Sequence, residues 1–471
     1  MRIVSILLFL MSLYTNINGQ GITRAKAKAD MDYLHKYLSK WHPSYDRYHT
    51  EDQIDSMIQI LKHQLPDSLT YRHIRIYVSK AVQFIGCGHT SVGFSSLAKV
   101  DSLPTILPLD VYVINGKLYI RNILFADSTR YKGAEILSIN GLSASSILDT
   151  MQLINMSDGY NTTHYDSRIE KYFSFFYRHL FGGVDHGEIE IKNIDDMTET
   201  IQIQSTSNLG NPNKYRRYQP DSTTIVFEGG GMALHHLPDV KDAMLLSVKS
   251  FGTGSQKSVR KKTFKYLKSK KIKHLIIDLR GNGGGNMFTG YKFLSYLLDE
   301  KIIGLNFGRM PSFMLFQPKL KLNWANRLTN LSFMLNPLQY PSKHGWMHLF
   351  PFLRKKNAFN GEIYVLTDGG TFSMASAVAA KLKNKRNAKI IGTETGGGAY
   401  GSAGMSEGKI ILPNSKIPVS FNTYWTINRI GHKDVGHGVM PDYAPIVSIR
   451  DVLAEKDVDL IKALELIKNN Q

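Results

Sequence analysis

The C-terminal half of the chain alternates short apolar runs with stretches of helical pattern. Strands that alternate with helices form βαβ units, because each helix carries the chain back to start the next parallel strand. The pattern therefore predicts an α/β domain with a mainly parallel sheet over residues 208–471. The predicted strands cover residues 244–248, 275–278, 363–367 and 389–391.

The rest of the chain divides into three regions by pattern. Residues 1–19 combine one positive charge, a short apolar core and a small residue near the end, which is typical of a secretory signal peptide. We therefore expect an exported protein, periplasmic or extracellular. Residues 20–100 carry helical apolar stripes, and residues 101–207 read mainly as short strands, with an Asn-Gly hairpin turn at 115–116. Residues 310–353, rich in Phe, Met, Trp and Pro, form either a lid or a packing insertion.

Charge and cysteine content exclude several classes of protein. Cys87 is the only cysteine, so no disulfide can form within the chain, and stability must come from a packed core. The net charge is +19, but the lysines of residues 257–273 fit the solvated face of a helix, and no nucleic-acid motif accompanies them. No later apolar run is long enough to cross a bilayer. We expect no nucleic-acid partner and no stable membrane insertion.

Ser373 follows the third predicted strand. Residues 361–376 predict a buried strand, a turn and a helix that starts at Ser373. A serine at such a junction faces substrate, and the N–H of Met374 with the positive end of the helix dipole can stabilise an oxyanion. The pattern fits either a serine nucleophile or a plain N-terminal cap. Ser376, one turn further, either assists Ser373 or bonds its own helix.

Glycine-rich loops add to this picture. Residues 283–285 follow an apolar strand and allow a substrate carbonyl to approach the backbone closely, although a tight turn would use the same residues. Residues 396–401 formally match the dinucleotide pattern GxGxxG, but no helix follows and no acidic residue lies about twenty positions on. With no Walker or HExxH motif and no paired cysteines, we expect no cofactor and no metal.

Five short motifs occur in a fixed order along the chain. They are Gly-His-Thr at 88–90, Asp-Leu-Arg-Gly-Asn-Gly-Gly-Gly at 278–285, Gly-Gly-Thr-Phe-Ser at 369–373, Ile-Gly-Thr-Glu-Thr-Gly-Gly at 391–397 and Gly-Val-Met-Pro-Asp at 438–442. Together they resemble the serine peptidase family of the C-terminal processing peptidases and the tricorn core. The resemblance implies a crotonase-like parallel β/α catalytic domain. Residues 133–141 also resemble the strand and turn of a PDZ domain, which implies a PDZ-like module at 101–207.

The resemblance also implies roles for individual residues. Ser373 would be the nucleophile, and the N–H groups of Gly284 and Met374 would form the oxyanion hole. C-terminal processing peptidases carry a lysine base after the Thr-x-Gly motif, where this chain has Gly398. The tricorn-like branch instead uses the histidine of Gly-His-Thr, which is His89 here.

A histidine base agrees with physical chemistry, because a serine hydroxyl needs a neighbouring base whose pKa lies near ambient pH. For the third catalytic residue, Asp434 is our first choice and Glu394 the second. These residues predict an exported serine endopeptidase that cleaves polypeptides through an acyl-enzyme. The PDZ-like module would hold the substrate by strand addition. The alternatives are a catalytically degenerate binding protein of the same fold and, more distantly, acyl-CoA chemistry. The sequence does not determine the oligomeric state.

Overall fold

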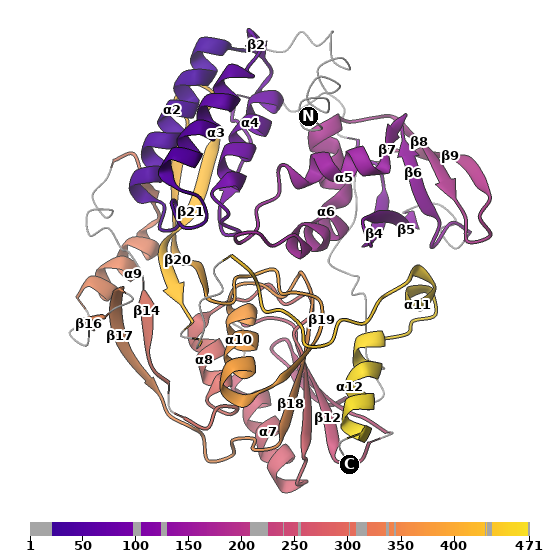
Figure 1. The fold of residues 1–471 in the computed structure, drawn as a ribbon, viewed down its shortest axis with the longest axis vertical. Helices are drawn as coiled ribbons and strands as arrows, with labels where there is room; N and C mark the ends of the chain where they lie inside the picture. The colour runs from indigo at the N-terminus through magenta and orange to yellow at the C-terminus, as the bar shows by residue number, and fades with distance from the viewer. Residues whose placement is uncertain are drawn as a thin grey trace.

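The structure is a computed structural model that describes residues 21–97, 105–123, 130–207, 225–238, 240–252, 256–300, 302–307, 318–335, 339–342, 345–428, 430 and 436–469. The predicted signal peptide and the predicted third catalytic residue, Asp434, lie outside these ranges. Helices and strands build several sheets, so the mixed α/β class is confirmed (Figure 1).

A central sheet organises the C-terminal domain. Its strand order is β10-β11-β12-β13-β18-β19. The last four of these strands pair in parallel, as the alternating pattern predicts, and β10 and β11 add an antiparallel hairpin at one edge. The strands are β10 (Ile225–Gly229), β11 (Met232–His236), β12 (Ala243–Val248), β13 (His274–Asp278), β18 (Glu362–Thr367) and β19 (Lys389–Gly392).

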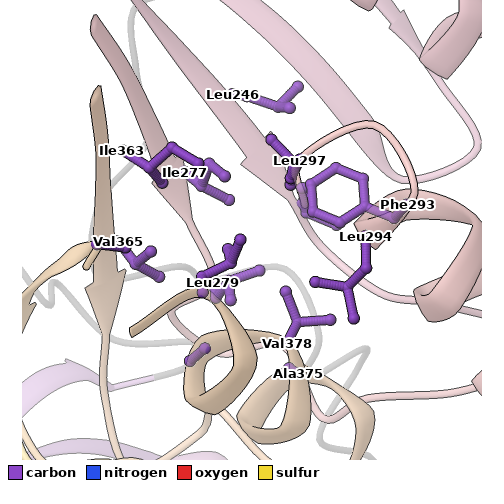
Figure 2. Packing of buried hydrophobic residues seen from close by; sticks show 14 of the residues in the cluster. Leu246, Ile277, Leu279, Phe293, Leu294, Leu297, Ile363, Val365, Ala375 and Val378 are labelled. Atoms are coloured by element: carbon purple, nitrogen blue, oxygen red, sulfur yellow. The ribbon is translucent and has the colours of Figure 1, made fainter. Parts of the chain in front are cut away.

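Alternate residues of these strands face two different helical layers. On one face, Leu246, Ile277 and Val365 pack against α7 (Gln256–Ser269), α8 (Met287–Leu294) and α10 (Met374–Arg386), as Figure 2 shows in part. On the other face, Leu245 and Ile276 join a cluster with α12 (Val458–Asn469). The sheet is covered on both sides, so the C-terminal ends of its strands, with the loops that follow them, are held in place by packing.

A second sheet has the order β15-β20-β21-β14-β17-β16, with β3 paired to β21. It includes the described part of the segment 310–353, so this part adds strands and a helix to a sheet. The predicted lid function of the segment stays a prediction. The elements are β3 (Ser91–Val92), β14 (Ile302–Phe307), β15 (Lys321–Leu322), α9 (Trp324–Met334), β16 (Gln339–Ser342), β17 (Gly345–Phe352), β20 (Gly401–Ile411) and β21 (Pro418–Ile427).

The N-terminal helices start at threonine caps, whose side-chain oxygens accept backbone N–H groups of the first turn. These helices are α2 (Arg24–Trp41), α3 (Glu51–His63) and α4 (Tyr71–Phe84), and β1 (Ile22–Thr23) pairs with β2 (Ser68–Leu69) beside them. They share one hydrophobic core with the second sheet, in which Leu34 and Val78 join Val419 and Phe421 (Figure 1). The helical region therefore packs as part of the C-terminal domain.

The middle module is an antiparallel sheet with the order β4-β5-β6-β8-β9, to which β7 adds. The predicted hairpin is confirmed, since Asn115 and Gly116 both have positive φ, at 52° and 75°. The elements are β4 (Leu109–Ile114), β5 (Lys117–Ile123), β6 (Glu135–Ile139), β7 (Leu142–Ser143), α5 (Ala144–Gln152), α6 (Thr163–Phe181), β8 (His186–Lys192) and β9 (Thr198–Gln204).

Helix α6 lies against the outer edge of β4. The Ser174 hydroxyl donates to the carbonyl oxygen of Leu109 at 2.7 Å, and the N–H of Val113 donates to the Glu170 carboxylate at 2.8 Å. These backbone groups are the ones that an added peptide strand would need. A peptide strand added at β4 would have to displace these bonds, and the expectation of strand addition stays a prediction. The PDZ-like character of the module stays a prediction.

Candidate functional site

Ser373 stands at a strained turn between β18 and α10. Its φ of 54° and ψ of −123° lie in a region that residues other than glycine rarely adopt. Its side chain makes no capping hydrogen bond, so the plain-cap interpretation is not supported. The side chain is partly exposed. A strained strand-to-helix turn that presents a serine is the geometry of a nucleophile elbow.

The loop after β13 holds this turn in place. One Asp368 carboxylate oxygen accepts the N–H groups of Gly281 and Gly370, at 2.8 and 2.9 Å. The N–H of Phe372, the residue before the serine, donates to the carbonyl oxygen of Asn282 at 2.9 Å. The backbone around Ser373 is therefore fixed by two neighbouring parallel strands, which offsets the cost of its strained dihedral angles.

Gly284 closes the other side of the turn. A Cβ atom built on Gly284 would lie 2.7 Å from Ser373 Cβ and 2.8 Å from the nitrogen of Met374, so only glycine fits. The N–H of Gly284 donates to Asn282 Oδ1 at 2.9 Å. This N–H group is therefore already bonded, and it would have to leave Asn282 to bind an oxyanion. Its place in an oxyanion hole stays a prediction. The N–H of Met374 has no acceptor in the described part of the chain.

His89 reaches the same turn from the far end of the sequence. Its ring packs on the ring of Phe372 with centroids 4.6 Å apart, and a Cβ at Gly88 would lie 2.7 Å from Phe372 Cζ. Burial lowers the pKa of His89 to about 4, so the imidazole is neutral near pH 7. This pKa lies below the range near ambient pH that we expected of the base. Its direct pairing with Ser373 stays a prediction.

The third catalytic residue is expected to accept a hydrogen bond from His89 Nδ1. His89 Nδ1 finds no hydrogen-bond partner among the described residues. Asp434, our first choice, lies outside the described ranges. Glu394, the second choice, accepts the N–H of Gly438 at 2.7 Å and lies 3.4 Å from Nδ1 of His437. Glu394 is therefore oriented by other partners.

Two further candidates prove to be structural. The Ser376 hydroxyl is buried and donates to the carbonyl oxygen of Thr371 at 2.8 Å, so it bonds its own turn. Cys87 is buried, and burial raises the pKa of its thiol to about 12. A thiol that stays protonated is a poor nucleophile. In the ranges that the structure covers, no group of His, Cys, Asp and Glu residues could hold a metal ion. Nor does any described helix have the length and apolar character to span a bilayer.

The sequence analysis did not identify the segment that connects the loop of His89 with the loops around Ser373. We call residues 158–164, which run from the loop after α5 into the first turn of α6, the bridging segment. The carboxylate of Asp158 accepts the N–H of Gly88 at 2.8 Å and the N–H of Gly398 at 3.1 Å. The N–H of Tyr160 donates to the carbonyl oxygen of Gly436 at 2.7 Å. Gly88 belongs to the first of the five motifs, and Gly398 and Gly436 lie beside the fourth and the fifth.

The other end of the bridging segment bonds the loops that follow β18 and β19. Asn161 Nδ2 donates to the carbonyl oxygen of Thr395 at 3.1 Å. His164 Nδ1 lies 2.9 Å from the carbonyl oxygen of Gly369, so this nitrogen carries the proton. The His164 ring also stacks on Phe372, with centroids 4.3 Å apart and an interplanar angle of 12°. The only sequence signal is the Asp-Gly pair at 158–159, which ordinarily indicates a turn.

Buried neutral histidines around the site predict acid sensitivity. His42 is buried and bonds Thr90, next to His89, and burial lowers its pKa to about 3. The unfolded chain therefore takes up protons below pH 6.5 that the folded protein does not, and the free energy of unfolding falls as pH falls through this window. Each such histidine contributes at most about 1.4 kcal/mol per pH unit. Asp158, whose pKa burial raises to about 6, acts in the opposite direction.

Thermal unfolding between pH 7.5 and 4.5 tests this. We expect His42→Gln to flatten the dependence of Tm on pH, whereas His236→Gln, at an exposed position, leaves it unchanged. Parallel curves of Tm against pH for His42→Gln and the wild type would show that His42 does not cause the acid sensitivity.

Part of the chain matches the model of a known protein family. Residues 242–444, which include Gly284 and Ser373, match the model of peptidase family S41. The match supports a serine peptidase and agrees with the resemblance of the five motifs. No curated protein matches the chain. The His-using branch stays a prediction.

Solved structures extend the similarity to nearly the whole chain. The structure of mature CPAF complexed with lactacystin has a TM-score of 0.66 at 16% identity, over 95% of this chain and 99% of that chain. A crystal structure of mature CPAF has a TM-score of 0.64 at 17% identity, over 95% of this chain and 98% of that chain. The photosystem II D1 C-terminal processing protease matches with a TM-score of 0.40 at 12% identity, over 89% and 93% of the two chains. The chain therefore shares the fold of CPAF.

Proposed function

We propose that the chain is an exported serine endopeptidase that hydrolyses polypeptides through an acyl-enzyme on Ser373. The observation that carries the proposal is the strained backbone of Ser373, with φ 54°, at the start of α10. Residues in such conformations persist only where the surrounding structure holds them, and they cluster at active sites. The match to peptidase family S41 over the same residues supports the same reaction.

The proposed mechanism uses the groups that lie around the serine turn. Neutral His89 takes the hydroxyl proton of Ser373 while the oxygen attacks the substrate carbonyl. The N–H of Met374 and the positive end of α10 stabilise the oxyanion, and Gly284 supplies a second donor once its N–H leaves Asn282. His89 then gives the proton to the leaving amine, and water repeats the sequence on the ester. Asp434 would accept a hydrogen bond from His89 Nδ1 and stabilise the imidazolium.

One observation favours a second candidate. His89 Nδ1 has no hydrogen-bond partner among the described residues, and Oε1 of Glu394 accepts the N–H of Gly438 at 2.7 Å. A histidine without such a partner is a weaker base, so a catalytically inactive binding protein of the same fold is the alternative.

Labelling with a fluorophosphonate probe tests the proposal. The Ser373 oxygen attacks phosphorus and fluoride leaves, so the peptide that carries the phosphonate identifies the nucleophile. We expect the label on Ser373, its complete loss in Ser373→Ala, and a decrease of about 10²- to 10⁴-fold in labelling rate in His89→Ala. Ser376→Ala is the matched control, since it removes a buried hydroxyl from the same helix, and we expect it to keep the label.

Two results would contradict the proposal. Undiminished labelling of Ser373→Ala would reject Ser373 as the nucleophile. A wild-type protein that unfolds cooperatively but takes no label would favour the binding protein. Full labelling of His89→Ala would leave Ser373 in place but remove His89 as the base.

A further inference from the structure

We propose that Asp158 is a positioning residue, which holds the loop of His89 and the loop beside Ser373 at the separation that the reaction requires. This inference rests on the proposed function. Asp158 belongs to none of the five motifs and comes from the middle module.

The two oxygens of Asp158 bond two different loops. Oδ1 accepts the N–H of Gly88, the residue before His89, at 2.8 Å. Oδ2 accepts the N–H of Gly398 at 3.1 Å. Gly397, adjacent to Gly398, packs so closely on the serine turn that a Cβ there would lie 2.7 Å from the nitrogen of Ser373. One carboxylate therefore connects the loop of the base to the loop that supports the nucleophile.

Asp158 is itself held firmly. The N–H of the next residue, Gly159, donates to the carbonyl oxygen of Gly86 at 2.8 Å. Gly159 also lies against Gly436, since a Cβ on Gly159 would be 2.4 Å from Gly436 Cα. Contacts on both sides fix the backbone of Asp158, so its carboxylate can determine where the two loops lie.

The chemistry of the position calls for an ionised carboxylate. Asp158 is 1% exposed, and burial together with the negative charge of Asp158 raises the pKa of Tyr48 and of Cys87. Both side chains are neutral when protonated and negative when ionised, so neither supplies a positive countercharge to Asp158. Burying a carboxylate without a cation costs free energy, and burial raises the pKa of Asp158 to about 6. Each of the two backbone N–H groups needs a hydrogen-bond acceptor. An ionised carboxylate offers one oxygen to each of them, whereas an asparagine side chain would offer one oxygen and turn its own NH₂ group toward the other N–H.

Asp158→Asn separates positioning from folding, because it keeps the shape of the side chain and removes one of the two bonds. The matched control is Asp30→Asn. Asp30 is also a fully buried carboxylate, and its two oxygens accept the N–H groups of Asn414 and Ser415 at 2.8 and 2.7 Å, at the turn between β20 and β21. Both variants remove a negative charge from a buried site that accepts backbone N–H groups.

The measurement is fluorophosphonate labelling, with the final stoichiometry and the second-order rate constant determined separately. We expect Asp158→Asn to reach the wild-type stoichiometry with a rate constant lower by about 10- to 100-fold, because a displacement of about 1 Å can cost that much. Asp158→Ala should be slower still. Asp30→Asn should keep the wild-type rate constant even if its Tm falls. A lower stoichiometry with an unchanged rate constant would show that Asp158 only stabilises the fold, and would overturn the inference.

Hydrogen–deuterium exchange gives a readout that does not depend on activity. We expect the amides of residues 86–90 and 396–400 to lose protection together in Asp158→Asn, and to keep it in Asp30→Asn. Unchanged protection of both loops would reject the inference whatever the labelling shows. If the wild type takes no label, or Ser373→Ala keeps it, the proposed function fails, and the exchange result still decides whether Asp158 joins the two loops.

Discussion

Replacing Gly284 by alanine is expected to abolish the reaction at Ser373. The new Cβ would lie 2.7 Å from Ser373 Cβ, 2.8 Å from Met374 N and 2.8 Å from Phe372 O, and two of these three atoms belong to the backbone. The serine turn must therefore move, together with the N–H of Met374. We expect the labelling rate of Ser373 to fall by at least about 10²-fold, the typical cost of losing one aligned oxyanion donor.

The same substitution should also destabilise the protein. Gly284 has a φ of 95°, where an L-residue costs roughly 1–2 kcal/mol, and overpacking adds roughly 1–3 kcal/mol. Denaturant unfolding measures this sum.

Gly283→Ala is the matched control, because a Cβ on Gly283 meets nothing within 4 Å. We expect it to keep both the labelling rate and the stability of the wild type. Equal effects of the two substitutions would mean that loop flexibility, and not contact with Ser373, explains the loss.

Replacing Arg280 by methionine is expected to give the largest loss of stability. Arg280 is 9% exposed, and its guanidinium donates hydrogen bonds to the carboxylates of Asp278, Asp457 and Asp459 at 2.8–3.1 Å. Asp457 and Asp459 lie at the start of α12, so this cluster fastens the C-terminal helix to the loop that leads to Gly284. Removing the cation leaves these carboxylates without a countercharge, which typically costs roughly 3–5 kcal/mol.

The loss of stability in Arg280→Met should depend on pH, and the protonation of the carboxylates determines in which direction it changes. Burial raises the pKa of Asp459 to about 6 even with Arg280 present. Without Arg280 the folded protein gains stability by taking up protons, so the difference between wild type and variant should shrink as pH falls through 6. Denaturant unfolding at pH 8 and pH 5 measures it.

Arg354→Met is the control, since Arg354 pairs with Asp299 at 3.2 Å in an exposed position and should contribute roughly 0–1 kcal/mol. A loss for Arg280→Met as small as that for Arg354→Met would show that the cluster is not a significant source of stability.

Local sequence signals predict much of the catalytic domain. The apolar runs at 244–248 and 275–278 have strand length and follow one another through a helix, which is sufficient to predict parallel pairing. The turn at Ser373 is also a local feature, because a buried strand, glycines and a helix start follow within sixteen residues. The close approach of Gly284 to Ser373 follows from the same logic, since loops after neighbouring parallel strands meet at one edge of the sheet.

The remaining features depend on contacts that no local pattern encodes. Asp158 bonds residues that are 70 and 240 positions away, and a single aspartate before a glycine indicates only a turn. The length of α6 was equally hidden, because its second half is rich in aromatic residues, which favour strands as much as helices. The Asn282 side chain that occupies the N–H of Gly284 reflects a side-chain conformation, which sequence does not specify.

The core shared by the N-terminal helices and the second sheet has a practical consequence for recombinant work. A fragment that begins near residue 208 would contain every residue that matches the family model, yet it would leave the apolar faces of β20 and β21 open to water. Such a fragment would expose Ile410, Val419 and Phe421 together, and contiguous apolar surface of this kind promotes aggregation. Expression of the protein should therefore retain α2, α3 and α4.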